Sequence, residues 1–112
     1  MKKYPVLEPI IGSREKKYVQ DCVESGWVSS WVKYIGKFEQ AFAQFIGTKH
    51  ALTTCNGTVS LHLIMLALGI GKGDEVIVPN FTYVASANAV RYVGAKPIFV
   101  DCDEFTFNID PE

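Results

Sequence analysis

The sequence predicts an α/β fold in which helices pack on a mostly parallel sheet. After residue 49, short β-prone runs alternate with helical stretches, and this alternation is typical of parallel strands joined by crossover helices. Before residue 49, apolar residues recur three and four positions apart and predict helices. We therefore expect a helical segment over residues 1–48 and a βαβαβ part of a sheet over residues 49–112.

Two helices are expected in the first segment. Ser13 is the predicted cap of a helix whose apolar stripe reaches Val23 and stops at Gly26. The second helix carries four apolar residues at helical spacing before Gly47, namely Ile35, Phe38, Phe42 and Phe45. Between these helices, residues 27–32 hold two tryptophans without a helical period. This segment is too apolar for an ordinary solvated linker.

Three strands are expected in the second segment. They cover residues 50–54, 75–78 and 97–100, with helices over residues 58–68 and 82–92. Proline ends the middle strand at position 79 because it cannot continue the ladder. The last three residues, Asp-Pro-Glu, are typical of the start of a further helix. We therefore expect the domain to be truncated at this point.

Charge and cysteine content weigh against several classes of protein. Eleven basic and twelve acidic residues leave a formal charge of −1, which provides no basic field for nucleic acid or for an anionic membrane surface. The longest apolar stretch, residues 63–68, is far shorter than the roughly 20 residues of a membrane crossing. Three widely spaced cysteines without a C-x-x-C pair argue against disulfides and zinc. We expect a cytoplasmic protein without a metal.

The turn Cys55-Asn56-Gly57-Thr58 is a candidate anion site. It lies between an expected strand and the N-terminus of an expected helix, where unpaired N–H groups and the helix dipole favour a phosphate. Gly57 allows close approach of the backbone, and Thr58 adds a hydroxyl donor. The same residues also fit an ordinary capped turn or an N-x-T glycosylation sequon, and no dinucleotide or P-loop motif is present.

Two further candidates follow strand ends. Phe81 and Tyr83 come after the middle strand, at the sheet edge where open α/β folds bind ligands. Either ring can stack on a flat cofactor, or both can belong to the core. Asp101 and Asp103 follow the last strand. They would hold a divalent metal in a glycosyltransferase that uses a sugar nucleotide, or they would cap turns.

Several motifs, taken in order, resemble the N-terminal part of the DegT/DnrJ/EryC1/StrS family of sugar aminotransferases, which use pyridoxal 5'-phosphate (PLP). The resemblance covers nearly the whole chain. It is carried by residues 26–30 (GWVSS), 38–47, 55–63 (CNGTVSLHL), 71–79 (GKGDEVIVP), 81–86 (FTYVAS) and 100–101. It implies the large domain of the aspartate-aminotransferase fold, also called fold type I.

The resemblance also implies roles for seven residues. Gly57 and Thr58 would bind the PLP phosphate, and Tyr83 would stack on the pyridine ring. The residues that would border the pocket of the nucleotide-sugar substrate are Trp27, Val28, Ser29 and Ser30. The lysine that reacts with PLP in this family would lie beyond Glu112. No catalytic residue is therefore expected in this chain, which should be inactive alone.

For the full-length protein, the resemblance implies transfer of an amino group from glutamate to a keto sugar nucleotide. The finer match is to members that aminate GDP-4-keto-6-deoxymannose during polysaccharide or natural-product sugar biosynthesis. Family members are generally homodimers. Three alternatives stay open: a dehydratase of the same family, in which histidine replaces the lysine; a metal-dependent glycosyltransferase; and a non-enzymatic interaction module that uses the apolar surface of residues 27–31.

Overall fold

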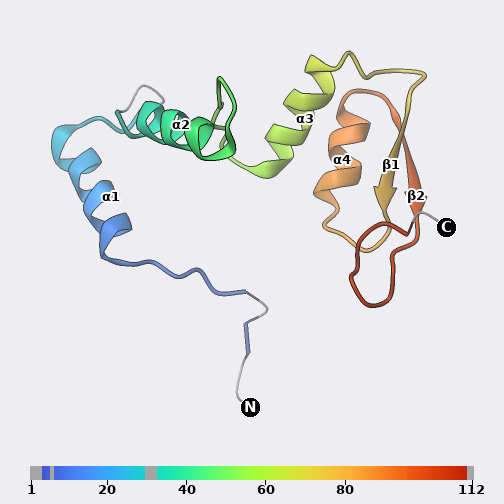
Figure 1. The fold of residues 1–112 in the computed structure, drawn as a ribbon, viewed down its shortest axis with the longest axis horizontal. Coiled ribbons are helices and arrows are strands. Elements are labelled where there is room, and N and C mark those ends of the chain that lie inside the picture. The colour runs from blue at the N-terminus through green and yellow to red at the C-terminus, as the bar shows by residue number, and fades with distance from the viewer. Residues whose placement is uncertain (1–3, 6, 30–32, 111–112) are drawn as a thin grey trace. The chain divides into compact units, whose positions relative to one another are not determined.

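The computed structural model describes residues 4–5, 7–29 and 33–110, and the chain divides into two compact units, Met1–Thr53 and Thr54–Glu112 (Figure 1). The first unit contains helices α1 (Ser13–Ser25) and α2 (Lys33–Ile46). The second contains α3 (Gly57–Ala67), β1 (Glu75–Pro79), α4 (Ala85–Tyr92) and β2 (Lys96–Val100). Within the described ranges, no helix is both long and apolar enough to cross a membrane.

Both helices predicted for the first unit are confirmed. Each ends before a glycine in the left-handed region, Gly26 with φ 73° and Gly47 with φ 79°, where a side chain would be strained. The predicted cap is wrong by one residue, because Gly12 occupies the N-cap position and Ser13 is the first helical residue. The carboxylate of Glu15 accepts the Gly12 N–H at 2.8 Å. This bond satisfies the N-cap backbone without a serine side chain.

Polar and aromatic contacts join α1 to α2. The rings of Tyr18 and Tyr34 lie 4.8 Å apart, centroid to centroid. The Tyr34 hydroxyl donates to Asp21 Oδ2 at 2.9 Å, and Lys33 Nζ lies 2.5 Å from the same oxygen. Among the described residues of this unit, Ala43 is the buried one. The apolar stripes of the two helices therefore remain largely exposed.

The second unit is a βαβ arrangement with a hydrophobic core. Strands β1 and β2 pair in parallel, with Val78 opposite Phe99, and α4 connects them. Helices α3 and α4 pack against each other, and α4 also contacts both strands. The core consists of five buried apolar residues: Met65, Val78, Ala89, Val90 and Ala95. The α/β class and the parallel pairing predicted from the sequence are confirmed.

The predicted strand over residues 50–54 does not form. Strands β1 and β2 pair with each other in a two-stranded sheet, and the described residues supply no neighbouring strand for residues 50–54. A strand needs a partner for its backbone N–H groups. The Thr53 N–H donates instead to a side chain, Glu39 Oε1, at 2.8 Å. The prediction of a strand here is therefore wrong.

Helix α4 begins at Ala85, three residues later than predicted from Thr82. The residues before it form a turn, in which Tyr83 accepts a backbone hydrogen bond from Ser86 at 3.2 Å, and the Asn80 N–H donates to Val100 O at 2.9 Å. This turn directly extends the pairing of β1 with β2. The first residues of the predicted helix are therefore used to connect strand and helix.

Residues after β2 fold back on themselves. Cys102 and Ile109 form an antiparallel bridge, and the ring of Phe107 lies 5.3 Å from that of Phe81. The apolar residues near the C-terminal end thus contribute to a closed loop.

Candidate functional site

The turn before α3 has the hydrogen-bonding pattern of a capped helix start. Asn56 is the N-cap, and its Oδ1 accepts the Val59 N–H at 3.0 Å. The Asn56 carbonyl accepts the Ser60 N–H at 3.2 Å. Within the described part of the chain, the N–H groups of Gly57 and Thr58 and the Thr58 hydroxyl donate to no other residue. Three donors at a helix N-terminus are thus available to an anion.

The space next to this turn suits a phosphate. A Cβ built on Gly57 would meet no atom within 4 Å, so a ligand oxygen can approach the backbone at this point. The turn is also braced from within, because Thr54 Oγ1 lies 2.5 Å from Ser60 Oγ and donates to Asn56 O at 3.1 Å. These bonds brace the residues on either side of Gly57 and Thr58.

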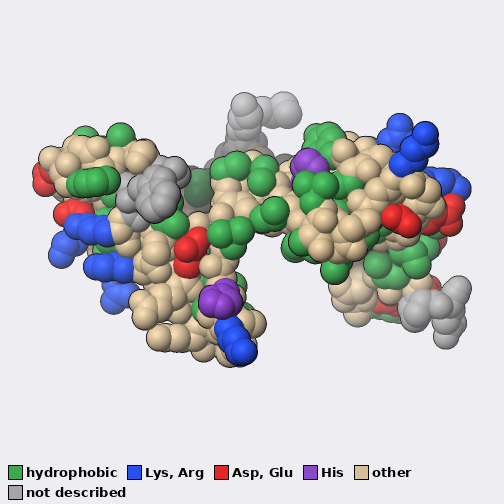
Figure 2. Space-filling model, turned by 90° about the horizontal axis from the view of Figure 1, so that it is seen from above, with side chains coloured by type: hydrophobic (Ala, Val, Ile, Leu, Met, Phe, Trp, Pro, Cys, Tyr) green, Lys and Arg blue, Asp and Glu red, His purple; other side chains and the backbone are tan. Residues whose placement is uncertain are grey.

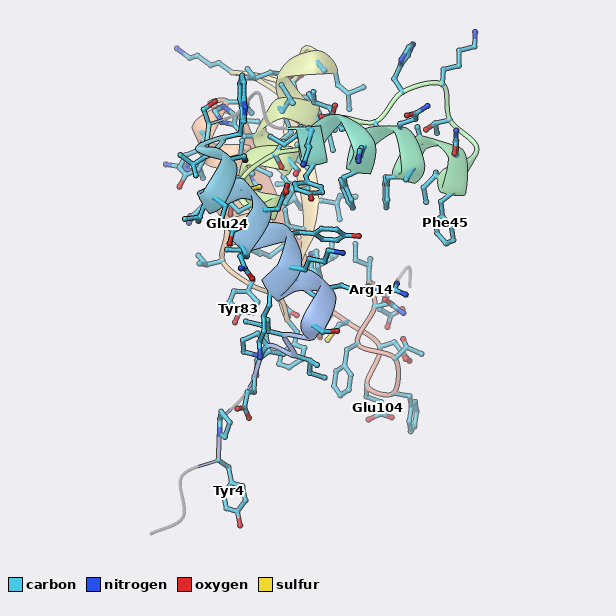
Figure 3. All side chains as sticks on the ribbon, turned by 90° about the vertical axis from the view of Figure 1, so that its left-hand side faces the viewer. Tyr4, Arg14, Glu24, Phe45, Tyr83 and Glu104 are labelled. Carbon is cyan, nitrogen blue, oxygen red and sulfur yellow. The ribbon has the colours of Figure 1, made fainter. Side chains whose placement is uncertain are left out.

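Tyr83 lies at the same end of the second unit as this turn. Figure 1 shows that the arrowheads of β1 and β2 and the first turns of α3 and α4 share one end. Tyr83, labelled in Figure 3, is 83% exposed and lines an open depression of about 580 Å³ formed by residues 80–84. No hydrogen bond or ring contact joins it to Gly57 or Thr58 among the described residues. Phe81 lines the same depression and packs against Phe107, whereas Tyr83 is the more exposed of the two rings.

The two acids after β2 are used as turn caps. Asp101 Oδ1 accepts from Asn80 Nδ2 at 3.1 Å and from the Cys102 N–H at 2.9 Å. Asp103 Oδ1 accepts from the Thr106 hydroxyl and N–H, both at 2.7 Å. These hydrogen bonds from Thr106 lower the pKa of Asp103. No cluster of three or more histidine, cysteine or acidic side chains suited to a metal occurs in the part of the chain that the structure describes.

A cavity of about 900 Å³ lies in the first unit, where α1, α2 and the segment after α1 meet. Trp27, Val28 and Ser29 line it, as the resemblance implies for a substrate pocket, whereas Ser30 lies outside the described residues. The other walls combine aromatic rings with ammonium groups: Tyr18, Tyr34, Phe38, Lys17 and Lys37. Such a lining suits a ligand that carries both a flat ring and negative charge.

The ion pair beside this cavity fixes one of its walls. The hydrogen bond from Lys33 is the main cause that lowers the pKa of Asp21, and the Tyr34 hydroxyl adds to it. The same bond raises the pKa of Lys33. Both groups are therefore charged at neutral pH. The Lys33 ammonium also lies 5.1 Å from the centroid of the Tyr34 ring. Tyr34 is therefore held at its ring by Lys33 and at its hydroxyl by Asp21.

The sequence analysis did not identify Lys17, Tyr34, Lys37 or Glu39. The first three line the cavity. They lie on two separate helices, so they form no motif that can be recognised in the sequence. Glu39 accepts two hydrogen bonds from Thr53. The sequence feature that could have drawn attention to Glu39 was its place directly after Phe38, next to the apolar stripe of the second helix.

Comparison with known proteins identifies related enzymes. The DegT/DnrJ/EryC1/StrS aminotransferase family matches residues 9–112. The GDP-perosamine synthase of Vibrio cholerae is 54% identical over 108 residues, which make up 96% of this chain and 29% of that protein. Among solved structures, an aminotransferase from Psychrobacter cryohalolentis has a TM-score of 0.84 and 39% identity, over 92% of this chain and 26% of the other.

A solved dehydratase is also similar. The E. coli GDP-4-keto-6-deoxy-D-mannose-3-dehydratase with bound hydrated PLP has a TM-score of 0.83 and 29% identity, over 98% of this chain and 30% of the other. The chain thus spans less than one third of the length of each of these relatives. Since the family match covers nearly all of the sequence, the chain belongs to the DegT/DnrJ/EryC1/StrS aminotransferase family.

Proposed function

We propose that this chain is the N-terminal, phosphate-binding part of a PLP-dependent enzyme that transfers an amino group from glutamate to a keto sugar nucleotide. The observation that carries the proposal is the set of three available donors at the Gly57-Thr58 turn. The 54% identity to a GDP-perosamine synthase supports GDP-4-keto-6-deoxymannose as the substrate. The family resemblance supports a homodimer in the cytoplasm.

The chain's own residues would bind and orient the cofactor. The N–H groups of Gly57 and Thr58 and the Thr58 hydroxyl would hold the phosphate, aided by the dipole of α3. Tyr83 would lie against the flat ring. When bound, PLP supplies an electron-accepting ring for removing the α-proton of glutamate. The lysine that takes part in this chemistry would come from sequence beyond Glu112.

The cavity of the first unit would bind the sugar nucleotide. Trp27, Val28 and Ser29 would border it, and the family resemblance adds Ser30, which lies outside the described residues. The aromatic walls would face the nucleobase, and the ammonium groups of Lys17 and Lys37 would face the diphosphate. The cavity lining has two properties, flat rings and positive charge. In this assignment the rings match the nucleobase and the positive charge matches the diphosphate of the same substrate.

The test uses the full-length protein supplied with PLP, glutamate and GDP-4-keto-6-deoxymannose. We expect formation of 2-oxoglutarate in equal amount to a sugar nucleotide in which an amino group has replaced the keto oxygen, as measured by mass spectrometry. A product that has lost water instead of gaining an amino group would establish the dehydratase, which the similarity to the E. coli enzyme favours as the second candidate. Absence of any PLP-dependent product would overturn the proposal.

A further inference from the structure

Glu39 makes a tertiary contact that precedes the phosphate turn. Its Oε1 accepts both the Thr53 N–H and the Thr53 hydroxyl, each at 2.8 Å, across 14 residues of sequence. Glu39 and Thr53 are both half-buried. These two bonds lower the pKa of Glu39, the backbone bond contributing most. The carboxylate is therefore ionised at neutral pH, and its hydrogen bonds are of the strong, charge-assisted kind.

Thr53 and Thr54, two consecutive residues of the segment before α3, are both held by side-chain hydrogen bonds. Thr53 is held by Glu39, and the next residue, Thr54, bonds to the carbonyl of the N-cap residue Asn56 and to Ser60. Two consecutive residues on the way from α2 to the cap of α3 are therefore each fixed by hydrogen bonds.

We propose that Glu39 is a positioning residue for the phosphate turn. By fixing the backbone of Thr53, it orders the chain segment that leads to Gly57 and Thr58 before the ligand binds. This inference rests on the proposed binding of PLP at that turn. An ordered turn binds a ligand more tightly because less conformational entropy is lost on binding. Glu39 itself does not touch the ligand in this account, since its carboxylate is directed at Thr53.

The test compares the affinities of the full-length apoprotein and its variants for PLP and for pyridoxal, which lacks the phosphate. Glu39→Ala removes the acceptor, and we expect it to weaken PLP binding about tenfold while pyridoxal binding stays within about twofold. Glu39→Gln keeps the accepting oxygen and should restore PLP affinity to within about threefold of the unmodified protein. Gln40→Ala, an exposed neighbour on the same helix, serves as the matched control and should change neither affinity.

Each outcome separates the inference from the proposed function. An unmodified protein that does not bind PLP would overturn both. Normal PLP binding by the Glu39→Ala variant would overturn the inference alone. Equal weakening of PLP and pyridoxal binding would also count against it, because it would indicate general damage to the fold. If Glu39→Ala does not fold, Thr53→Val removes only the hydroxyl bond, and it must then weaken PLP binding selectively for the inference to stand.

Discussion

The two units of this chain are stabilised in different ways. The second unit buries five apolar residues in one core between its helices and strands. In the first unit, Ala43 is the buried apolar residue among those described, and Phe45 at the end of α2 is 85% exposed. Figure 2 shows hydrophobic side chains at the surface over much of the molecule. Side-chain hydrogen bonds and ring contacts, rather than buried area, thus hold the first unit.

This difference indicates which interactions stabilise the candidate site in each unit. The turn at Gly57-Thr58 begins a helix that packs on the core of the second unit. The cavity of the first unit depends on the ion pair of Asp21 with Lys33 and on exposed aromatic rings. We expect the first unit to respond more strongly to changes in charge, and the second to changes in packing.

The largest expected effect comes from a charge placed in the core. Val90→Asp puts a carboxylate at a fully buried position, which costs more than about 4 kcal/mol without a partner. Hydrogen exchange of the 112-residue chain should lose protection in α4, β1 and β2 but not in α1. Val19→Asp, at a position 64% exposed on α1, is the control and should leave the second unit protected. Equal loss in both variants would refute the distinction between the units.

The second effect concerns the phosphate turn. Thr58→Val removes the hydroxyl donor, and loss of a hydrogen bond to a charged group, about 1.5–3 kcal/mol, should weaken PLP binding at least tenfold in the full-length protein. An absorbance titration measures this affinity. Thr48→Val removes a hydroxyl that donates to His50 O in the first unit, and it should leave PLP affinity unchanged. Unaltered binding by Thr58→Val would show that the phosphate lies elsewhere.

The third effect is smaller and concerns the ring at position 83. Tyr83→Leu removes an aromatic face worth about 1 kcal/mol, so PLP affinity should fall about fivefold, whereas Tyr83→Phe should retain it. The same titration applies. Phe81→Leu should disturb the loop that contains Phe107 and have less effect on affinity than Tyr83→Leu. The reverse order of the two leucine variants would assign the stacking role to Phe81.

The smallest effect is a dependence on pH in the first unit. Hydrogen bonds from Lys33 and Thr53 lower the pKa values of Asp21 and Glu39, respectively. The stability that these carboxylates contribute is therefore present above their ordinary pKa values, 3.8 and 4.5, and is lost as pH falls through the lowered values. Acid titration followed by NMR should perturb α1 and α2 before the core residues of α4. Simultaneous loss of both units would contradict this order.

The sequence predicted those elements whose signals are local. Apolar periodicity predicted α1 and α2, and short apolar or small-residue runs bounded by glycine and proline predicted α3, α4, β1 and β2. The prediction of a strand over residues 50–54 was wrong, because strand formation depends on a partner strand as well as on β-propensity. The cap at Ser13 failed because Glu15, three residues beyond the N-cap, bonds to the backbone of Gly12.

The same distinction applies to the candidate site. The turn at Gly57-Thr58 was predictable because an N-cap and its donors lie within four residues. The residues alone did not distinguish Tyr83 from Phe81, and the family resemblance chose Tyr83; the contact of Phe81 with Phe107 depends on the tertiary fold. The bonds of Glu39 to Thr53 join residues 14 positions apart, and nothing in a single amphipathic helix indicates which distant group a polar residue meets.

A structure of the full-length protein crystallised with PLP tests the central claim most directly. The account predicts the PLP phosphate within hydrogen-bonding distance of the Gly57 and Thr58 N–H groups and the Thr58 hydroxyl, with the ring of Tyr83 against the pyridine. A phosphate bound away from the N-terminus of α3, with these three donors still without a ligand, would contradict it.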